Sequence, residues 1–166
     1  MLKQSYRPNW LQRINHRLAS SRAMAWLFSL TSHHIDGPLM RLSNGRISLL
    51  GPLSGLPIIL LTTTGAKTKQ PRTLPIIGIP DGEKIVLIGT NWGRKTYPGW
   101  YHNLQAAPAA TVSANGQTGE YAVREAEGVE REEYWRRAVN LYSGYAAYLT
   151  RIGARRVPVM VLTPKK

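Results

Sequence analysis

Short β-rich runs bounded by proline and glycine constrain the fold of this chain most strongly. Two pairs of runs are joined by strong hairpin signals, Pro80-Asp81-Gly82 between "RTLPIIGI" and "EKIVLIGT", and Asn115-Gly116 between "ATVSA" and "QTGEYAVREA". Further runs are "SNGRISLLGP", "GLPIILLTTTG" and "VPVMVLTP". About six short strands linked in this way predict a mainly β fold with flanking helices, a small barrel rather than a parallel α/β sheet.

Two helical segments interrupt the β-rich runs. The first begins at Pro98, a residue suited to the first turn of a helix, and continues as "GWYHNLQA" until Pro108 ends it. The second is "EREEYWRRAVNLY", which carries acids at its N-terminal end. We expect a bend at Gly144, after which "YAAYLTR" continues the helix.

Residues 1–37 are predicted to form an amphipathic helical segment and residues 38–166 the barrel domain. The segment combines apolar residues near helical spacing with three arginines, namely Trp10, Leu11, Ile14, Leu18, Trp26, Leu27 and Leu30 with Arg13, Arg17 and Arg22. It either docks on the barrel or lies on an anionic membrane. Its longest apolar run is far short of the roughly 20 residues of a bilayer span, and no signal cleavage site follows. These features predict a cytoplasmic protein, with attachment to the inner membrane face as the open alternative.

The chain carries a formal net charge of +13, from 22 Lys and Arg against 9 Asp and Glu. Asp36 is the only acid before residue 81, and six of the nine acids lie between Glu120 and Glu133. A basic first half predicts an anionic partner, and nucleic acid, an anionic membrane surface and a phosphorylated small molecule all satisfy that requirement. The absence of cysteine excludes disulfides, thiolate metal sites and a cysteine nucleophile.

The stretch "LLTTTGAKTKQPRTLP", from Leu60 to Pro75, passes from an apolar strand through a glycine turn into the cations Lys67, Lys69 and Arg72, with no acid. The order of its glycine and lysine does not match a Walker loop, and the chain contains no G-x-G-x-x-G. Hydroxyls, backbone N–H groups and cations at a strand end suit a phosphate or a carboxylate. A solvated basic hairpin loop is the alternative interpretation.

Three blocks occur along the chain, "LLTTTGAKTKQPR", "PGWYHNLQAAP" and "EYWRRAVNLYSGYAAYL". Together they resemble the deazaflavin-dependent nitroreductase and quinone reductase family, whose members use coenzyme F420. The resemblance spans residues 57–164 and implies a split β-barrel of the FMN-binding, pyridoxamine-oxidase-like type. It also implies hydride transfer from reduced F420 to a quinone, a nitroaromatic or another activated unsaturated acceptor. An FMN-binding oxidoreductase and a non-catalytic lipid or cofactor carrier of the same fold are the alternatives.

By this resemblance, the turn after the threonines holds the phosphate and acidic tail of the coenzyme, and the strand end at Thr90 lies against the deazaflavin ring. Ala66 stands where family members often have Arg, and Lys69 stands where they often have Gly, so one cation is lost and another gained. Thr90 and nearby N–H groups are expected to polarise the ring carbonyl or the substrate. The implied cofactor-binding residues are Ala66, Lys67, Thr68, Arg72, Thr73, Leu74, Pro75, Ile76, Ile77, Ile88, Gly89, Thr90, Asn91, Gly99, Trp100, Tyr101, His102 and Asn103.

Tyr142, Tyr145 and Tyr148 follow one another at three-residue steps, a spacing that predicts three rings on one broad face of a helix. The resemblance implies that tyrosines in this segment contact the substrate, so these three and Thr90 are the catalytic candidates. Tyr145 is the first candidate for orienting or protonating the acceptor. The alternative is that the rings belong to the core and only their hydroxyls reach its rim.

Other chemistries find less support in the sequence. No metal site is predicted, because acids are scarce near the four histidines, and no G-x-S-x-G elbow suggests a hydrolase. A basic barrel with exposed aromatics can hold single-stranded nucleic acid. The aromatic residues of "GWYHN" and "YSGYAAY", however, fall in predicted helices instead of alternating along strands, which argues against nucleic acid as the partner.

Overall fold

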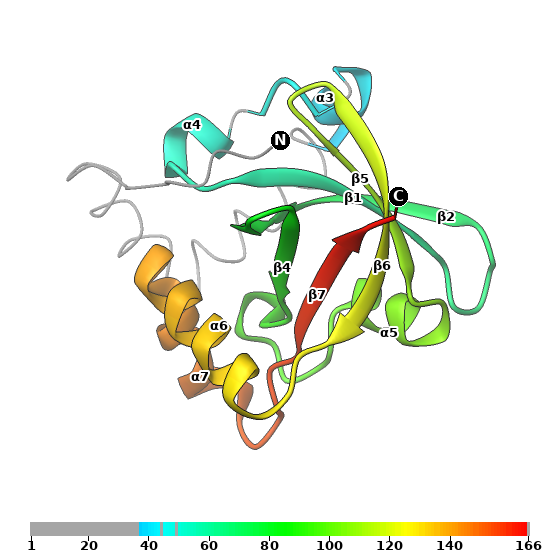
Figure 1. Ribbon diagram of the computed structural model, residues 1–166. Helices are drawn as coiled ribbons and strands as arrows, with labels where there is room; N and C mark the ends of the chain where they lie inside the picture. Colours follow the sequence, from blue (N-terminus) through cyan, green and yellow to red (C-terminus); the bar gives the residue numbers. More distant parts are fainter. Residues whose placement is uncertain (1–36, 44, 49, 166) are drawn as a thin grey trace.

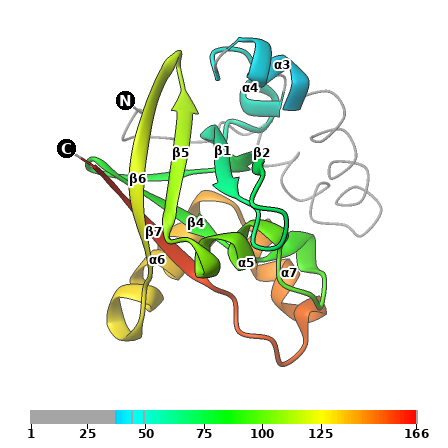
Figure 2. The same ribbon diagram turned by 90° about the vertical axis from the view of Figure 1, so that its right-hand side faces the viewer.

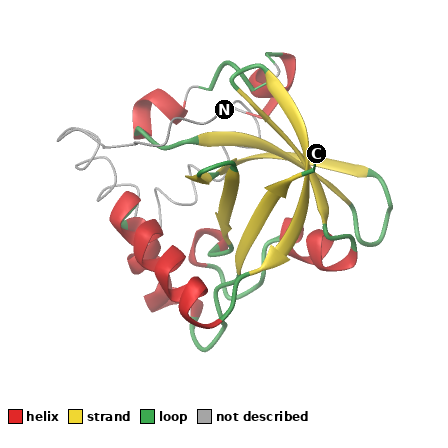
Figure 3. Ribbon diagram, in the orientation of Figure 1, coloured by secondary structure: helices red, strands yellow, loops and turns green. Residues whose placement is uncertain are grey.

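The computed structural model describes residues 37–43, 45–48 and 50–165. The predicted N-terminal helical segment therefore lies outside the described residues, except for Gly37. The described residues form one antiparallel sheet with flanking helices, in agreement with the predicted fold class (Figures 1 and 3). The strands are β1 Ile58–Thr64, β2 Pro71–Ile77, β3 Ile79–Asp81, β4 Lys84–Ile88, β5 Ala109–Ala114, β6 Gln117–Glu125 and β7 Val159–Pro164. The helices are α3 Gly37–Leu42, α4 Leu50–Ser54, the 3-10 turn η2 Asn91–Gly93, α5 Gly99–Ala106, α6 Gly128–Leu141 and α7 Gly144–Ile152.

The order of the strands explains why the sheet curls into a half-barrel (Figure 2). Across the sheet the order is β2-β1-β5-β6-β7-β4-β3, so β2 and β3 form the two edges. These edge strands are nevertheless consecutive in the chain and are separated only by Gly78, which draws the edges together. A Cβ atom at Gly78 would lie 2.8 Å from Cδ1 of Ile59, so a larger residue would force the Ile59 side chain to move.

The predicted hairpin at Asn115-Gly116 is confirmed. The hairpin before β4 is confirmed only at its turn, because most of "RTLPIIGI" forms β2, which pairs with β1, and only β3 pairs with β4. Asn115 and Gly116 have φ values of 52° and 79°, the left-handed pair that a tight two-residue turn requires, and they join β5 to β6. Gly82, with φ at 61°, lies in the turn that joins β3 to β4. The register of the sheet is thus fixed by turn chemistry that the sequence displays locally.

The predicted strand within "SNGRISLLGP" is wrong, because its described residues form a turn that leads into α4. The Ser43 hydroxyl accepts a hydrogen bond from the N–H of Ile47 at 3.0 Å, and the Ser48 hydroxyl accepts one from the N–H of Gly51 at 2.9 Å. Gly45 is left-handed, with φ at 75°. Serine side chains therefore take the place of strand partners and cap a short helix.

The sheet is packed on both faces. Along β4, Val86 belongs to a core cluster that includes α6 and α7, whereas Leu87 belongs to a second cluster that includes α5. Val161 and Leu162 of β7 divide between the clusters in the same way. Helices thus cover opposite faces of the half-barrel, and no helix among the described residues is long and apolar enough to cross a membrane.

Candidate functional site

One cleft of about 1310 Å³ runs beside β2 and reaches the β1–β2 turn, η2, α5 and the junction of α6 and α7. Figure 1 shows the β1–β2 turn and the helices α6 and α7 at opposite sides of the half-barrel. Every predicted site residue lines this cleft except Gly89 and Tyr101. Six further residues line it that the sequence did not single out as site residues, namely Arg41, Ile58, Gly65, Pro71, Trp92 and Pro98.

The end of the cleft at the β1–β2 turn is basic. Lys67 and Arg72 line it and are exposed to solvent. Arg41 joins them from α3, and its Nη2 donates a hydrogen bond to the carbonyl of Thr73 at 2.5 Å. None of the acids in the described part of the chain lines the cleft. The ion pairs among the described residues involve none of these cations. These cations are therefore available to an anionic group of a ligand.

Backbone hydrogen bonds fix the shape of the turn itself. The N–H of Gly65 donates to the carbonyl of Gln70, and the N–H of Lys69 donates to the carbonyl of Gly65, each at 2.9 Å. Lys69 is left-handed, with φ at 57°. A Cβ at Gly65 would lie 2.7 Å from Oγ1 of Thr68 and 3.1 Å from the carbonyl oxygen of Gln70, so a larger residue there would crowd the turn.

Asn103, in α5, ties the turn to the helix. Its Nδ2 donates to the hydroxyl of Thr63 at 3.0 Å, and its Oδ1 accepts from the N–H of Ala66 at 2.9 Å. The resemblance implied direct contacts from Asn103 and Ala66 to the coenzyme. In the structure the side-chain amide of Asn103 and the backbone N–H of Ala66 are hydrogen-bonded to each other. Asn103 therefore positions the basic turn.

The end of β4 brings a buried hydroxyl to the cleft. Thr90 lines the cleft and only 4% of its surface is exposed, and no described residue hydrogen-bonds to its hydroxyl. Gly89 beside it is explained by packing, because a Cβ there would lie 2.5 Å from Cγ of Pro158. Gly89, one of the implied cofactor-binding residues, therefore packs against the chain before β7 and does not line the cleft. The Thr90 hydroxyl keeps its hydrogen-bonding capacity for a ligand.

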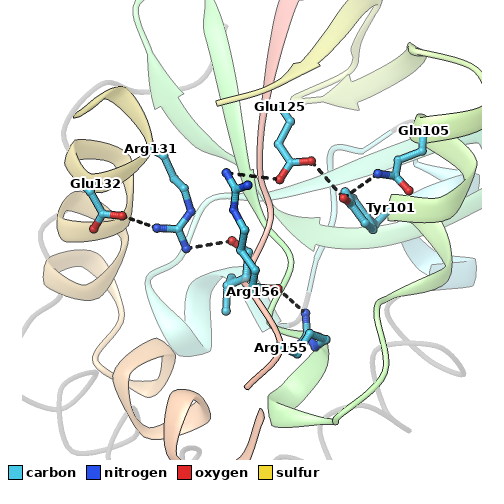
Figure 4. Close-up of polar contacts among 8 residues, drawn as sticks. Tyr101, Gln105, Glu125, Arg131, Glu132, Arg155 and Arg156 are labelled. Carbon is cyan, nitrogen blue, oxygen red and sulfur yellow. Dashed lines mark hydrogen bonds and ion pairs between the residues drawn. The ribbon is translucent and has the colours of Figure 1, made fainter. Parts of the chain in front are cut away.

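Tyr101 points away from the cleft, contrary to its predicted place in the site. Its hydroxyl donates to Oε2 of Glu125 at 3.0 Å and accepts from Nε2 of Gln105 at 2.6 Å (Figure 4). Arg156 lies on the other side of the same carboxylate, 4.0 Å from Oε1. Burial, reinforced by the hydrogen bond to Glu125, raises the pKa of Tyr101 to about 12. This network joins α5 to β6 and serves the fold.

The three candidate tyrosines meet at the inner end of the cleft, but they do not share one helix. Tyr142 follows the last residue of α6, whereas Tyr145 and Tyr148 lie in α7, so the predicted single helical face is wrong. The ring centroids of Tyr142 and Tyr145 are 5.3 Å apart, and the hydroxyls of Tyr142 and Tyr148 are 3.1 Å apart. A Cβ at Gly144 would lie 2.2 Å from Cζ of Tyr142, so the glycine gives this ring its place.

Each of these tyrosines belongs to the core and lines the cleft as well. Burial raises the pKa of Tyr142, Tyr145 and Tyr148 above the ordinary value of 10.0. The three phenols therefore stay neutral at physiological pH and keep their protons. No described residue hydrogen-bonds to the hydroxyl of Tyr145, which makes it a potential donor to a ligand.

Trp92 is the most prominent cleft residue that the sequence interpretation missed. It lies in η2 within a run of three left-handed residues, where Asn91, Trp92 and Gly93 have φ values of 51°, 57° and 78°. The left-handed conformation costs a bulky residue about 1–2 kcal/mol. The signal that could have revealed it is the pair of turn formers, Asn and Gly, on either side of a tryptophan.

A half-barrel with a cleft that is basic at its exposed end and aromatic at its buried end defines a split-barrel protein with room for a ligand. Solved structures share this fold. An F420-H2-dependent reductase is 36% identical, with a TM-score of 0.59 over 64% of this chain and 93% of that chain. A protein solved as a domain-swapped dimer is 28% identical, with a TM-score of 0.60 over 84% of this chain and 98% of that chain.

Residues 37–164 match the model of the F420H(2)-dependent quinone reductase family, and the chain belongs to that family. An F420H(2)-dependent quinone reductase of Mycobacterium tuberculosis is 32% identical over 140 residues, which cover 78% of this chain and 93% of the relative. The predicted family, the split β-barrel fold and the F420-dependent reductase activity are thereby confirmed. Coenzyme F420, rather than the alternative FMN, is the cofactor of this family.

The residues of the cleft fit this cofactor. An acidic tail requires cations without acid partners, which Arg41, Lys67 and Arg72 supply. A ring carbonyl requires a buried donor, which the Thr90 hydroxyl supplies. The volume of about 1310 Å³ exceeds the roughly 300–1,000 Å³ of ordinary ligand pockets, in keeping with a large cofactor.

Proposed function

We propose that the cleft binds reduced F420 with its acidic tail on the β1–β2 turn and its ring near Thr90, and that the acceptor enters at the tyrosine end. When bound, the coenzyme supplies a hydride at low potential. The observation that carries the proposal is the arrangement of one cleft, with exposed cations at one end and buried neutral phenols at the other. A quinone is the first acceptor that we propose, because the family reduces quinones.

The residues of this chain then have separate tasks. Lys67 and Arg72 hold the tail by charge-assisted hydrogen bonds, and Asn103 keeps their turn in place. Thr90 orients the ring through its buried hydroxyl. Tyr145 donates a hydrogen bond to the acceptor oxygen, where negative charge develops as the hydride arrives. No nucleophile is needed for this reaction.

We also propose nitroaromatic and other activated unsaturated compounds as acceptors. The support is that the tyrosine end offers apolar rings and neutral donors, which suit any flat electron-poor molecule with an oxygen acceptor. Quinones and nitroaromatics meet that description equally. The same features give no support to a polar or charged acceptor.

The experiment is a titration of the full chain with F420 and with FMN, followed by assays of reduced F420 oxidation. We expect F420 to bind more tightly than FMN and its reduced form to be oxidised when a naphthoquinone or a nitroimidazole is added. Tighter binding of FMN would overturn the cofactor assignment for this chain. Absence of turnover with every quinone tried, despite tight F420 binding, would overturn the reaction while leaving the binding site in place.

A further proposal concerns the residues before α3, which lie outside the described part of the chain. We propose that they attach the protein to an anionic membrane, where quinones are concentrated. The support is the composition of the segment, in which Arg13, Arg17 and Arg22 accompany tryptophans and leucines. Each cation near an anionic surface contributes about 1 kcal/mol.

Co-sedimentation with anionic vesicles at low salt tests this attachment. We expect the full chain to pellet with the vesicles and the variant with Arg13→Gln, Arg17→Gln and Arg22→Gln to stay in solution. Equal sedimentation of both proteins, or no sedimentation of the unmodified chain, would contradict the attachment.

A further inference from the structure

We propose that Trp92 determines acceptor specificity: it forms one wall of a flat slot at the tyrosine end of the cleft, and the slot selects fused-ring acceptors over small acyclic ones. This proposal rests on the proposed function, because the acceptor must enter at the tyrosine end. It starts from a feature that hydride transfer leaves unexplained, a large side chain on a backbone conformation that suits glycine.

The backbone of η2 argues that the Trp92 side chain has a task. Trp92 has φ at 57° and ψ at 24°, between Asn91 and Gly93, which are also left-handed. Asparagine and glycine adopt this conformation readily, whereas a bulky residue does so only when its surroundings impose it. Glycine at position 92 would satisfy the backbone better, so the indole must contribute something that glycine cannot.

Arg155 imposes the conformation from outside the cleft. Its Nη1 donates to the carbonyl of Gly89, and its Nη2 donates to the carbonyl of Thr90, each at 3.0 Å. Nη2 also donates to the carbonyl of Arg94 at 3.2 Å. The guanidinium lies over the ring of Tyr97, 4.8 Å from its centroid. One side chain therefore holds the backbone on both sides of η2 and fixes the direction in which Trp92 leaves it.

Helix α7 supports η2 from the other side. A Cβ at Gly93 would lie 3.4 Å from Cδ1 of Tyr148, so the turn packs directly against that ring. The Nδ2 of Asn91 donates to the carbonyl of Thr96 at 3.0 Å, which closes the loop that follows. The turn and the tyrosine cluster thus form one rigid unit.

The Trp92 side chain extends this unit into the cleft. It is half-buried, lines the cleft and packs against the core cluster that contains the three tyrosines. Ile58 and Ile77 from β1 and β2 pack against the same cluster and line the cleft too. The inner end of the cleft is therefore bounded by flat rings and aliphatic side chains. A flat conjugated molecule can stack on such rings, whereas an acyclic acceptor gains much less contact.

The test compares Trp92→Gly and Trp92→Phe with the unmodified protein, using a naphthoquinone and a small acyclic enone as acceptors. We expect Trp92→Gly to raise the KM for the naphthoquinone about tenfold, the loss typical of one aromatic contact, and to leave the KM for the enone within about twofold. Trp92→Phe should restore most of the naphthoquinone affinity because it keeps a flat ring. Trp135→Ala is the matched control, since Trp135 packs 6.3 Å from the ring of Tyr145 without lining the cleft.

Two further readouts separate specificity from damage to the fold. Calorimetric titration of the naphthoquinone into protein saturated with oxidised F420 should show the same loss for Trp92→Gly, with the Kd for F420 unchanged. If the glycine variant unfolds, Trp92→Asn, whose side chain also tolerates the left-handed backbone, is expected to give the same shift.

An unchanged KM for the naphthoquinone, an equal rise for both acceptors, or weakened F420 binding would overturn the role of Trp92. Failure of the proposed function gives a different result, namely no oxidation of reduced F420 by the unmodified protein with any quinone. In that case the calorimetric loss on Trp92→Gly is still expected, because the slot does not depend on turnover.

Discussion

The two ends of the cleft differ in solvent exposure and in charge. At the β1–β2 turn, Lys67 and Arg72 are exposed, charged and free of acid partners among the described residues. At the other end Tyr142, Tyr145 and Tyr148 are buried, neutral and part of the core. Under the proposed function, the contrast assigns affinity for the anionic tail to an environment screened by salt, and chemistry at the acceptor to one shielded from water.

The largest effect is expected from removing both cations of the turn. The double variant Lys67→Ala, Arg72→Ala should weaken F420 binding about 100-fold, because each charge-assisted contact contributes about 1–3 kcal/mol. The salt dependence of the Kd should flatten at the same time. Fluorescence titration of F420 at several salt concentrations measures both.

Lys69→Asn is the matched control for this pair, because Lys69 lies in the same turn without lining the cleft. Asparagine tolerates its left-handed backbone, with φ at 57°. We expect the control to change the Kd by less than about threefold, as for a screened distant charge. A control that matches the double variant would show that net charge, and not the cleft, governs binding.

The next largest effect should come from Gly144→Ala at the tyrosine end. The new Cβ would lie 2.2 Å from Cζ of Tyr142, a clash that requires the ring to move. Overpacking of this kind destabilises a fold by about 1–3 kcal/mol, which denaturant unfolding can measure. Gly99→Ala, where no atom lies within 4 Å of the added Cβ, is the control and should leave the free energy of unfolding within about 0.5 kcal/mol.

Tyr145→Phe should change the rate of quinone reduction without changing the affinity for F420. Loss of one neutral donor is expected to slow quinone reduction about 100-fold, the lower end of effects seen when a transition-state donor is removed. The Kd for F420 should stay unchanged, since the ring of Tyr145 remains in the core. Unchanged turnover with every acceptor would assign this tyrosine to packing alone.

A smaller effect is expected from Asn103→Leu, which leaves every cation in place. The variant loses the bonds to Thr63 and Ala66, each of which contributes about 1 kcal/mol in typical proteins. The turn should become less ordered, and F420 binding should weaken about fivefold with an unchanged slope against salt. A changed slope would mean that Asn103 acts on the charges themselves.

The smallest effect lies outside both ends, at Asp81. The hydrogen bond from Arg137, and then that from Tyr134, holds the pKa of Asp81 below its ordinary value of 3.8. Ionised Asp81 therefore stabilises the fold above that pH, and its contribution is lost as the pH falls through the lowered value. Asp81→Asn should cost about 1 kcal/mol or less at pH 7 and nothing in strong acid, without changing F420 binding.

The sequence predicted local features of the structure better than features that depend on tertiary contacts. The hairpin at Asn115-Gly116 and the turns at Gly82 and Gly65 were predictable, because each conformation is set by residues within the turn. The strand pairing before Gly82 was not, since β2 pairs with β1. The residues that the resemblance implied line one cleft, except Gly89 and Tyr101. The strand expected around Ser43 failed because serine side chains cap a helix there.

Features made by distant contacts escaped the sequence. The amide of Asn103 binds Thr63 and Ala66 some 40 residues earlier, and Arg41 reaches the carbonyl of Thr73 from α3. Trp92 owes its direction to Arg155, more than 60 residues later. Such pairings depend on how the half-barrel closes, and no local pattern displays that closure.

The most direct test of the central claim is a structure of the full chain with F420 bound. The account predicts that the acidic tail contacts Lys67 and Arg72 and that the ring lies against Thr90, with the space beside Tyr145 open for an acceptor. A tail bound away from the β1–β2 turn, or a coenzyme seated in the smaller cavity beside Tyr121, would contradict it.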